Sequence, residues 1–186
     1  MSSIFKSLQI PNGHSWTITT KFGHILRTAE ERYGERDKTY TLLGIEFTNQ
    51  GNPQIWYPDN CRNVCIQITE NCLSDLNRAV FQVAHETIHC LCPTGGQNAN
   101  VLEEGLANLF SIEYCAENGH GKNWTSNKQE YTNASNLVTE LLEFDNDIIK
   151  KLRAIQPILS LIDKKVILEI NPNIPEELAD ALTEKF

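Results

Sequence analysis

The 186-residue chain lacks the long apolar runs that a membrane helix or a secretory signal requires. No stretch approaches the ~20 consecutive apolar residues needed to cross a bilayer. The first residues, MSSIFKSLQIPNGHSW, contain no apolar core of the signal-peptide type. We therefore expect a cytoplasmic protein, with no membrane among its partners.

Clustered positive charge is also missing from the chain. Lys and Arg total 16 against 24 Asp and Glu, the formal net charge is −8, and Lys and Arg form no block. Surfaces that bind phosphate backbones or anionic lipids depend on such clusters. The composition therefore argues against nucleic acid as a partner.

The signatures of several other enzyme and metal-binding classes are absent. The chain has no GxxxxGK[ST] phosphate loop and no GxSxG nucleophile elbow, so nucleotide-hydrolase and serine-hydrolase interpretations lack a starting residue. Its cysteines match no paired CxxC pattern and do not resemble a disulfide framework, so we expect buried free thiols rather than a second metal site. These cysteines are Cys61, Cys65, Cys72, Cys90, Cys92 and Cys115.

Nothing in the sequence divides the chain into separate units. It contains no internal repeat, no low-complexity tract and no linker rich in Pro, Gly or Ser. Hydrophobic residues make up 40% of the chain, which suffices for the core of one domain of ordinary size. We expect residues 1–186 to form a single domain.

The first third of the chain is predicted to contain one helix and a small sheet. Apolar residues at helical spacing predict an amphipathic helix over residues 21–35. The β-rich segments 39–48 and 54–58, separated by the turn cluster NQGNP, predict a hairpin with a long loop. Residues 64–69 would add a third strand.

The remainder of the chain is predicted to be mainly helical. The clearest pattern follows Ser74, a candidate N-cap, and ends before Pro93; a second helix is predicted over 100–118. Further helices are expected at 134–154, at 157–164 and in a terminal segment opened by Pro175 at the first helical position. The fold class is therefore α+β: a short mixed or antiparallel sheet, two successive helices and a helical C-terminal part.

The stretch FQVAHETIHC, residues 81–90, contains His85, Glu86 and His89 in the order His-Glu-x-x-His. Side chains four apart share one helix face, so the two imidazoles can bind one zinc ion through bonds of about 2.0–2.1 Å. Glu86 is turned by about 100° from His85, too far to join them but near enough to reach a water molecule at the metal. A carboxylate there can accept the proton of that water as it attacks a carbonyl.

A third protein ligand is expected, because catalytic zinc sites typically have three and leave one position for water. The next predicted helix offers two adjacent carboxylates, Glu103 and Glu104. Glu104 shares its helix face with small or polar side chains that would allow a close approach to the histidines, whereas Glu103 lies on a more apolar side. Periodicity therefore favours Glu104 and leaves Glu103 open.

The two motifs together resemble the zincin metallopeptidases, and in particular their gluzincin branch. In that branch HExxH is followed on a second helix by a glutamate ligand, often within Glu-Gly-x-Ala. Here the matching residues are HETIH at 85–89 and EGLA at 104–107, and the resemblance covers about residues 74–115. It implies a zincin-like domain that hydrolyses peptide bonds, by analogy with small cytosolic HExxH proteins that act on regulatory proteins in bacteria.

The resemblance also implies roles for individual residues. His85, His89 and Glu104 would bind Zn²⁺, Glu86 would act as the general base, and the substrate would be a restricted set of peptides or proteins. Only fourteen residues separate His89 from Glu104, fewer than in large gluzincin peptidases, so the connection must be a compact loop.

Other interpretations compete with a peptidase. The two histidines could lie on a solvated helix face, although a random order of the same residues would contain HExxH only roughly 0.01 times. The chain could also be a zinc-binding interaction module without turnover, or a hydrolase that uses the same water chemistry on small amides or esters.

Additional residues are candidates for supporting roles. An oxyanion donor is needed beside the zinc, and Tyr131 is the first choice among Tyr114, His120 and Tyr131. Asn108 and Glu113 are candidates for the group that accepts the second ring hydrogen of a zinc-bound histidine, with an ordinary solvated role as the alternative for each.

Two further features are expected to shape the surroundings of the site. In the family that the chain resembles, an extended substrate pairs with a strand edge near the zinc, so strand 64–69 could offer that edge; the alternative is a buried strand. Gly105 would allow close helix packing next to the candidate ligand, or would be a neutral occupant of the helix start.

Overall fold

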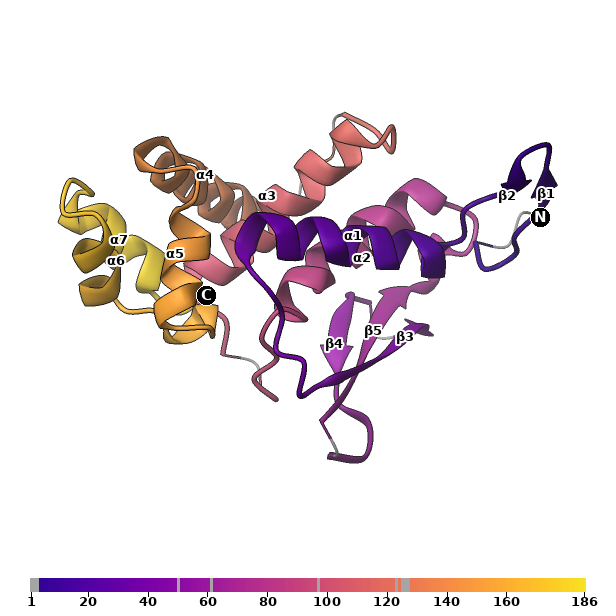
Figure 1. The fold of residues 1–186 in the computed structure, drawn as a ribbon, viewed down its shortest axis with the longest axis horizontal. Helices are drawn as coiled ribbons and strands as arrows, with labels where there is room; N and C mark the ends of the chain where they lie inside the picture. The colour runs from indigo at the N-terminus through magenta and orange to yellow at the C-terminus, as the bar shows by residue number, and fades with distance from the viewer. Residues whose placement is uncertain (1–3, 50, 61, 97, 123, 125–127) are drawn as a thin grey trace.

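The computed structural model describes residues 4–49, 51–60, 62–96, 98–122, 124 and 128–186. Within these residues the protein is α+β, with a two-stranded sheet, a three-stranded sheet and seven α-helices (Figure 1). The strands are β1 (Gln9–Ile10), β2 (Gly13–His14), β3 (Thr41–Thr48), β4 (Gln54–Trp56) and β5 (Asn63–Thr69). The helices are α1 (Ile18–Tyr33), α2 (Leu76–His89), α3 (Val101–Glu117), α4 (Gln129–Phe144), α5 (Ile148–Ile155), α6 (Lys164–Ile170) and α7 (Glu176–Thr183).

The larger sheet is mixed, and its strand order is β3-β5-β4. Strand β5 runs parallel to β3 and antiparallel to β4, with Ile66 opposite both Ile45 and Ile55. The predicted hairpin between β3 and β4 is therefore wrong, because β5 lies between these two strands. β5 is the most buried of the three strands, and Val64, Ile66 and Ile68 on one of its faces belong to the core, which suits a central position.

Local capping explains where several helices begin. Helix α1 starts earlier than predicted because Thr17 and Thr20 form a reciprocal capping box. Helix α2 is capped by the carboxylate of Asp75, and not by Ser74 as predicted. Pro175 is the N-cap of α7, one position before the first helical residue Glu176, whereas the sequence predicted Pro175 itself at the first helical position.

The C-terminal part differs from the predicted helices in two places. The segment 134–154 forms two helices, α4 and α5, because Asp145 is extended between them. The segment 157–164 contains only the short 3-10 turn Leu159–Leu161. Helix α6, which the predicted pattern missed, begins after Asp163, whose carboxylate accepts a hydrogen bond from its first turn.

Helices α2 and α3 pack side by side at the centre of the core and carry the candidate site (Figure 1). Helix α1 and the three-stranded sheet pack against α2, and α4 packs against the other side of α3. Helices α5–α7 lie at the end of the molecule opposite the β1–β2 hairpin. Among the residues described, no helix combines the length and the apolar character that crossing a membrane would take.

Arg153 of α5 binds backbone carbonyls at the C-terminal ends of α1 and α2. Its side chain is buried, and one guanidinium nitrogen donates hydrogen bonds to the carbonyls of Tyr33 and Gly34, both at 2.7 Å. Its other terminal nitrogen donates to Glu35 at 3.0 Å and to Leu91 at 3.4 Å. These carbonyls lie at or just after the C-terminal ends of α1 and α2, where helices leave such groups without partners inside the helix.

Gly105 is required by the close packing of α3 on α4. A Cβ atom built at this position would lie 2.4 Å from the carbonyl oxygen of Ala134 and 2.8 Å from Cγ2 of Val138. The obstructing oxygen belongs to the backbone and cannot rotate away. The interpretation of Gly105 as a packing residue is therefore correct, and the close contact holds the neighbouring Glu104 in place.

We predict that Gly105→Ala destabilises the protein by about 3 kcal/mol, because the added methyl group forces α3 and α4 apart. Chemical denaturation measures this free energy of unfolding. The matched control is Gly23→Ala within α1, where the added Cβ would meet only a flexible Arg27 nitrogen at 3.9 Å. That variant should be stabilised by roughly 0.5–1 kcal/mol. Equal stability of the two variants would contradict the assigned role of Gly105.

Candidate metal centre

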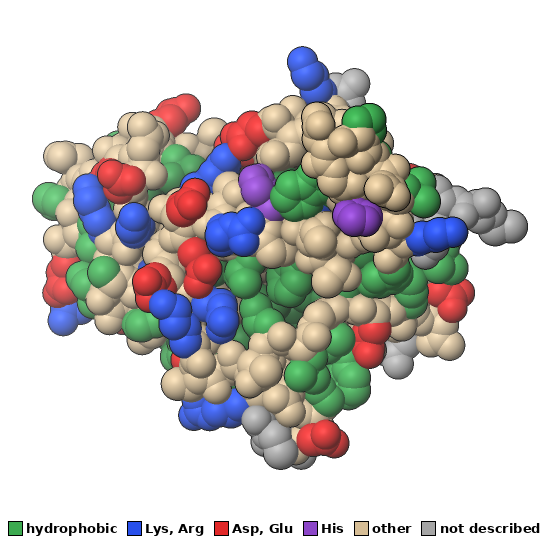
Figure 2. All heavy atoms as spheres, turned by 45° about the vertical axis from the view of Figure 1, so that its right-hand side comes forward, with side chains coloured by type: hydrophobic (Ala, Val, Ile, Leu, Met, Phe, Trp, Pro, Cys, Tyr) green, Lys and Arg blue, Asp and Glu red, His purple; other side chains and the backbone are tan. Residues whose placement is uncertain are grey.

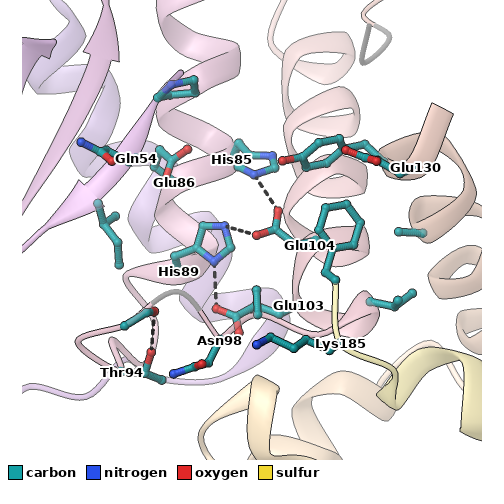
Figure 3. Close-up of a pocket in the computed structure, with 18 of the residues that line it drawn as sticks. Gln54, His85, Glu86, His89, Thr94, Asn98, Glu103, Glu104, Glu130 and Lys185 are labelled. Atoms are coloured by element: carbon teal, nitrogen blue, oxygen red, sulfur yellow. Dashed lines mark hydrogen bonds and ion pairs between the residues drawn. The ribbon is translucent and has the colours of Figure 1, made fainter. Parts of the chain in front are cut away.

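The last two turns of α2 and the first turn of α3 bring three side chains to one point (Figure 3). Nε2 of His85 lies 3.3 Å from Oε2 of Glu104, and Nε2 of His89 lies 3.6 Å from Oε1 of the same carboxylate. One donor atom from each residue lies within 4.8 Å of the other two. The histidines therefore face one point, and Glu104 reaches it from the neighbouring helix.

The arrangement fits a divalent cation better than a hydrogen-bonded cluster. Oε2 of Glu104 is buried and has no hydrogen-bond partner among the described residues, although His85 Nε2 is only 3.3 Å away. Buried carboxylate oxygens without partners are costly. A metal ion bound between the nitrogen and the oxygen would satisfy both, and two imidazoles with one carboxylate are ligands that zinc accepts.

Glu103 accepts the second ring hydrogen of His89. Its Oε1 lies 2.8 Å from Nδ1 of His89, on the side of the ring opposite Glu104. This contact places a hydrogen on Nδ1 and directs Nε2, the nitrogen that would bind a metal ion, at the shared point. The sequence analysis missed this role because it placed Glu103 on the apolar side of its helix. That side of α3 faces the end of α2. A carboxylate predicted to be buried needs a polar partner, and this was the signal in the sequence that could have indicated the role of Glu103.

The carboxylates around His89 favour a positive charge at the site. Burial alone lowers the pKa of His89, but the hydrogen bond that its ring donates to Glu103 and the charges of Glu104, Glu103 and Glu86 raise it to about 10. The pKa of Glu104 is lowered, because its contacts with His85 and the charge of His89 outweigh its burial. Negative potential therefore gathers where the imidazole nitrogens converge.

Glu86 lines the same cavity as the three candidate ligands and is not one of them. Its side chain is buried, and burial raises the pKa of its carboxyl group, while His85 and His89 act in the opposite direction. A carboxylate with a raised pKa beside the three candidate ligands is suited to accept a proton near neutral pH.

Tyr131 is the oxyanion candidate that the structure brings to the site. Its ring centroid lies 5.8 Å from that of His85, and it lines the cavity. Burial, reinforced by the charges of Glu104 and Glu86, raises the pKa of Tyr131 to about 12, so its hydroxyl keeps the hydrogen that it would donate.

The other oxyanion candidates have partners elsewhere in the fold. The hydroxyl of Tyr114 lies 2.6 Å from Nδ1 of His24 in the contact between α1 and α3. Nδ1 of His120 lies 2.9 Å from the Oδ1 atom of Asn77. Neither residue lines the cavity in which the donor atoms of His85, His89 and Glu104 converge.

The two residues proposed to support the histidines do not contact them within the described part of the chain. Asn108 donates hydrogen bonds to the carbonyl of Tyr131 at 3.2 Å and to the hydroxyl of Ser135 at 3.1 Å. It therefore fixes the first turn of α4, which carries Tyr131. Glu113 pairs with Arg32 at 3.1 Å, away from the cavity.

The cavity has a volume of about 970 Å³ and is walled by several elements. Its walls include β4, the loop after α2, the first turns of α3 and α4, and the terminal residues Lys185 and Phe186. β5 is the central strand, so the expected substrate edge does not belong to residues 64–69. The sheet edge that borders the cavity belongs to β4 (Gln54–Trp56).

The cysteines form no second metal cluster within the described residues. Cys65, Cys72, Cys90, Cys92 and Cys115 are free thiols, and all except Cys92 are buried. The group of His85, His89 and Glu104 is the one candidate metal cluster among the residues that the structure describes. Cys61 lies outside those residues.

We predict that Glu103→Ala weakens zinc binding about 10–100-fold, because the His89 ring loses the partner that orients it. Competition with a chromogenic chelator measures the affinity. Glu113→Ala is the matched control, because it removes a carboxylate from the same helix without touching the histidines, and its zinc affinity should equal that of the parent. Equal affinities for all three proteins would contradict the role of Glu103.

Comparisons with known proteins assign the chain to no family. No protein-family model, no curated protein and no solved structure matches it.

Proposed function

We propose that this protein is a zinc-dependent peptidase of the gluzincin type. The observation that carries the proposal is the convergence of His85, His89 and Glu104 within 4.8 Å, with the buried Glu104 Oε2 lacking a hydrogen-bond partner among the described residues. Glu86, which lines the same cavity, favours a hydrolytic centre over a purely structural one, since structural zinc sites need no adjacent carboxylate that is not a ligand.

The chain's own residues divide the work of hydrolysis. His85, His89 and Glu104 would hold the zinc ion, and Glu103 would orient His89. Zinc bound there supplies Lewis acidity, which polarises a substrate carbonyl and acidifies a water molecule. Glu86 accepts the proton of the attacking water and delivers it to the leaving amine. Tyr131 donates its hydroxyl hydrogen to the oxygen on which negative charge develops.

An extended peptide is the substrate best suited to this cavity. The edge of β4 borders the cavity and offers backbone groups that can pair with a peptide strand. Such pairing aligns a peptide bond without demanding particular side chains, so selectivity must come from the other walls. This supports a peptide or protein substrate over a small amide or ester.

The first test separates metal binding from chemistry. We predict that Glu86→Gln keeps about one zinc per chain but abolishes hydrolysis, because it removes the proton acceptor and no ligand. His85→Ala should lose both zinc and hydrolysis. Elemental analysis gives the stoichiometry, and chelator-sensitive digestion of a broad peptide library, read by mass spectrometry, gives the activity. Hydrolysis by Glu86→Gln at the parent rate would disprove the assignment.

The same assay decides between a peptidase and a zinc-binding interaction module. The module shares the metal site but has no turnover. Persistent absence of cleavage by the fully zinc-loaded parent would favour the module, whereas cleavage of small esters or amides without cleavage of peptides would favour a different hydrolase.

A second test addresses the oxyanion donor. We predict that Tyr131→Phe lowers kcat by about 100-fold or more, because the ring stays in place while its hydroxyl is lost. Zinc content should not change, since Tyr131 is not among the candidate ligands. Tyr114→Phe is the control, because that hydroxyl serves His24 outside the cavity. A kcat of Tyr131→Phe within about twofold of the parent would contradict the role.

A further inference from the structure

The terminal residues form a short strap along the cavity. The backbone amide of Val101 donates to the carbonyl of Glu184 at 2.9 Å, and the amide of Phe186 donates to the carbonyl of Ala99 at 3.1 Å. These two bonds form an antiparallel bridge beside the start of α3 and fix the backbone of Lys185 between them. Lys185 therefore occupies a defined place in the cavity wall.

Lys185 brings a positive charge that no carboxylate of the described residues neutralises through an ion pair. The second lysine of the cavity wall, Lys128, pairs with Glu130 at 3.5 Å. Glu103, on the same side as Lys185, already binds His89. On the face shown in Figure 2, acidic and basic side chains are interspersed. Lys185 is exposed and lines the cavity, so a ligand that enters the cavity can reach its ammonium group.

Amide and hydroxyl groups surround this end of the cavity. Figure 3 shows the side chain of Lys185 directed toward Asn98 and Glu103, with Thr94 nearby and Glu130 at the opposite end. The side-chain amide nitrogen of Asn98 lies close to Gly96 in the loop after α2, 3.0 Å from the position that a Cβ would take there. An ammonium group with an amide donor beside it is a common way to bind a carboxylate.

We propose that Lys185 and Asn98 form a subsite for a carboxylate group of the substrate. The inference rests on the proposed function, because it assigns the substrate chemistry of the same cavity. The carboxylate comes from an acidic side chain of the peptide or from its C-terminal α-carboxylate. In the first case the protein selects acidic sequences, and in the second it acts at chain ends.

Binding to the zinc-loaded Glu86→Gln protein tests the subsite without requiring turnover. The probes are two sets of positional-scanning peptides. One set is acetylated and amidated, with Glu, Gln or Lys fixed at each position in turn, and the other carries a free C-terminal carboxylate and no acidic side chain. Competition against a fluorescent peptide measures the affinities.

We expect Glu-containing peptides at one position, or the free-carboxylate set, to bind about tenfold more tightly than their neutral counterparts. Lys185→Ala in the same background should abolish that preference, and Lys185→Arg should restore most of it. The matched control is Lys128→Ala, which removes a lysine of the same cavity whose charge Glu130 already neutralises, and it should keep the preference. Asn98→Ala should weaken it.

The outcomes distinguish this inference from the peptidase assignment. Equal or tighter binding of neutral or Lys-containing peptides, or a preference that survives Lys185→Ala, overturns the subsite even if the parent hydrolyses peptides. Failure of all probes to bind also overturns it. A Lys185-dependent preference in a parent that cleaves nothing supports the subsite and refutes the peptidase.

Discussion

The contact between the last turn of α2 and the first turn of α3 determines the rest of the site. Two adjacent glutamates meet two histidines there: Glu104 faces both Nε2 atoms, and Glu103 binds Nδ1 of His89. Both glutamates are set by one cap, since the side chain of Asn100 accepts a hydrogen bond from the Glu103 amide at 2.9 Å. Burying four ionisable groups this way is unfavourable unless each finds a partner or a cation.

Sequence periodicity predicted the elements that carry the candidate site. The predicted helix 100–118 matches α3 closely, and the HExxH segment lies on α2 as expected. The proximity of Glu104 to both histidines was predicted from its helix face, which it shares with small or polar residues. These features depend on interactions within a helix or between successive helices, which local sequence encodes.

Features that depend on distant residues were not predictable. The predicted strand order was wrong because no local sequence signal shows that β5 pairs on both sides. The division into α4 and α5 was missed because the apolar pattern continues across Asp145. The role of Glu103 was missed for a related reason: apolar neighbours predict burial, but only the fold reveals that a histidine lies within that buried space. The contribution of Lys185 to the cavity wall likewise arises from a bridge to residues far away in the chain.

The guanidinium of Arg153 connects the helical C-terminal part to the half of the protein that carries the candidate metal centre. It donates to carbonyl groups at the C-terminal ends of α1 and α2, and among the described side chains it is the one donor to the Tyr33 and Gly34 carbonyls. The Leu91 carbonyl also accepts a hydrogen bond from the backbone amide of Asp37 at 2.8 Å. A shortened chain ending before α5 would lose the donor that reaches the Tyr33 and Gly34 carbonyls, and the Leu91 carbonyl would keep only the Asp37 amide. The half that carries the candidate site is therefore not an independent unit, because without α5 the C-terminal ends of α1 and of the histidine-bearing helix α2 lose the side chain that joins them.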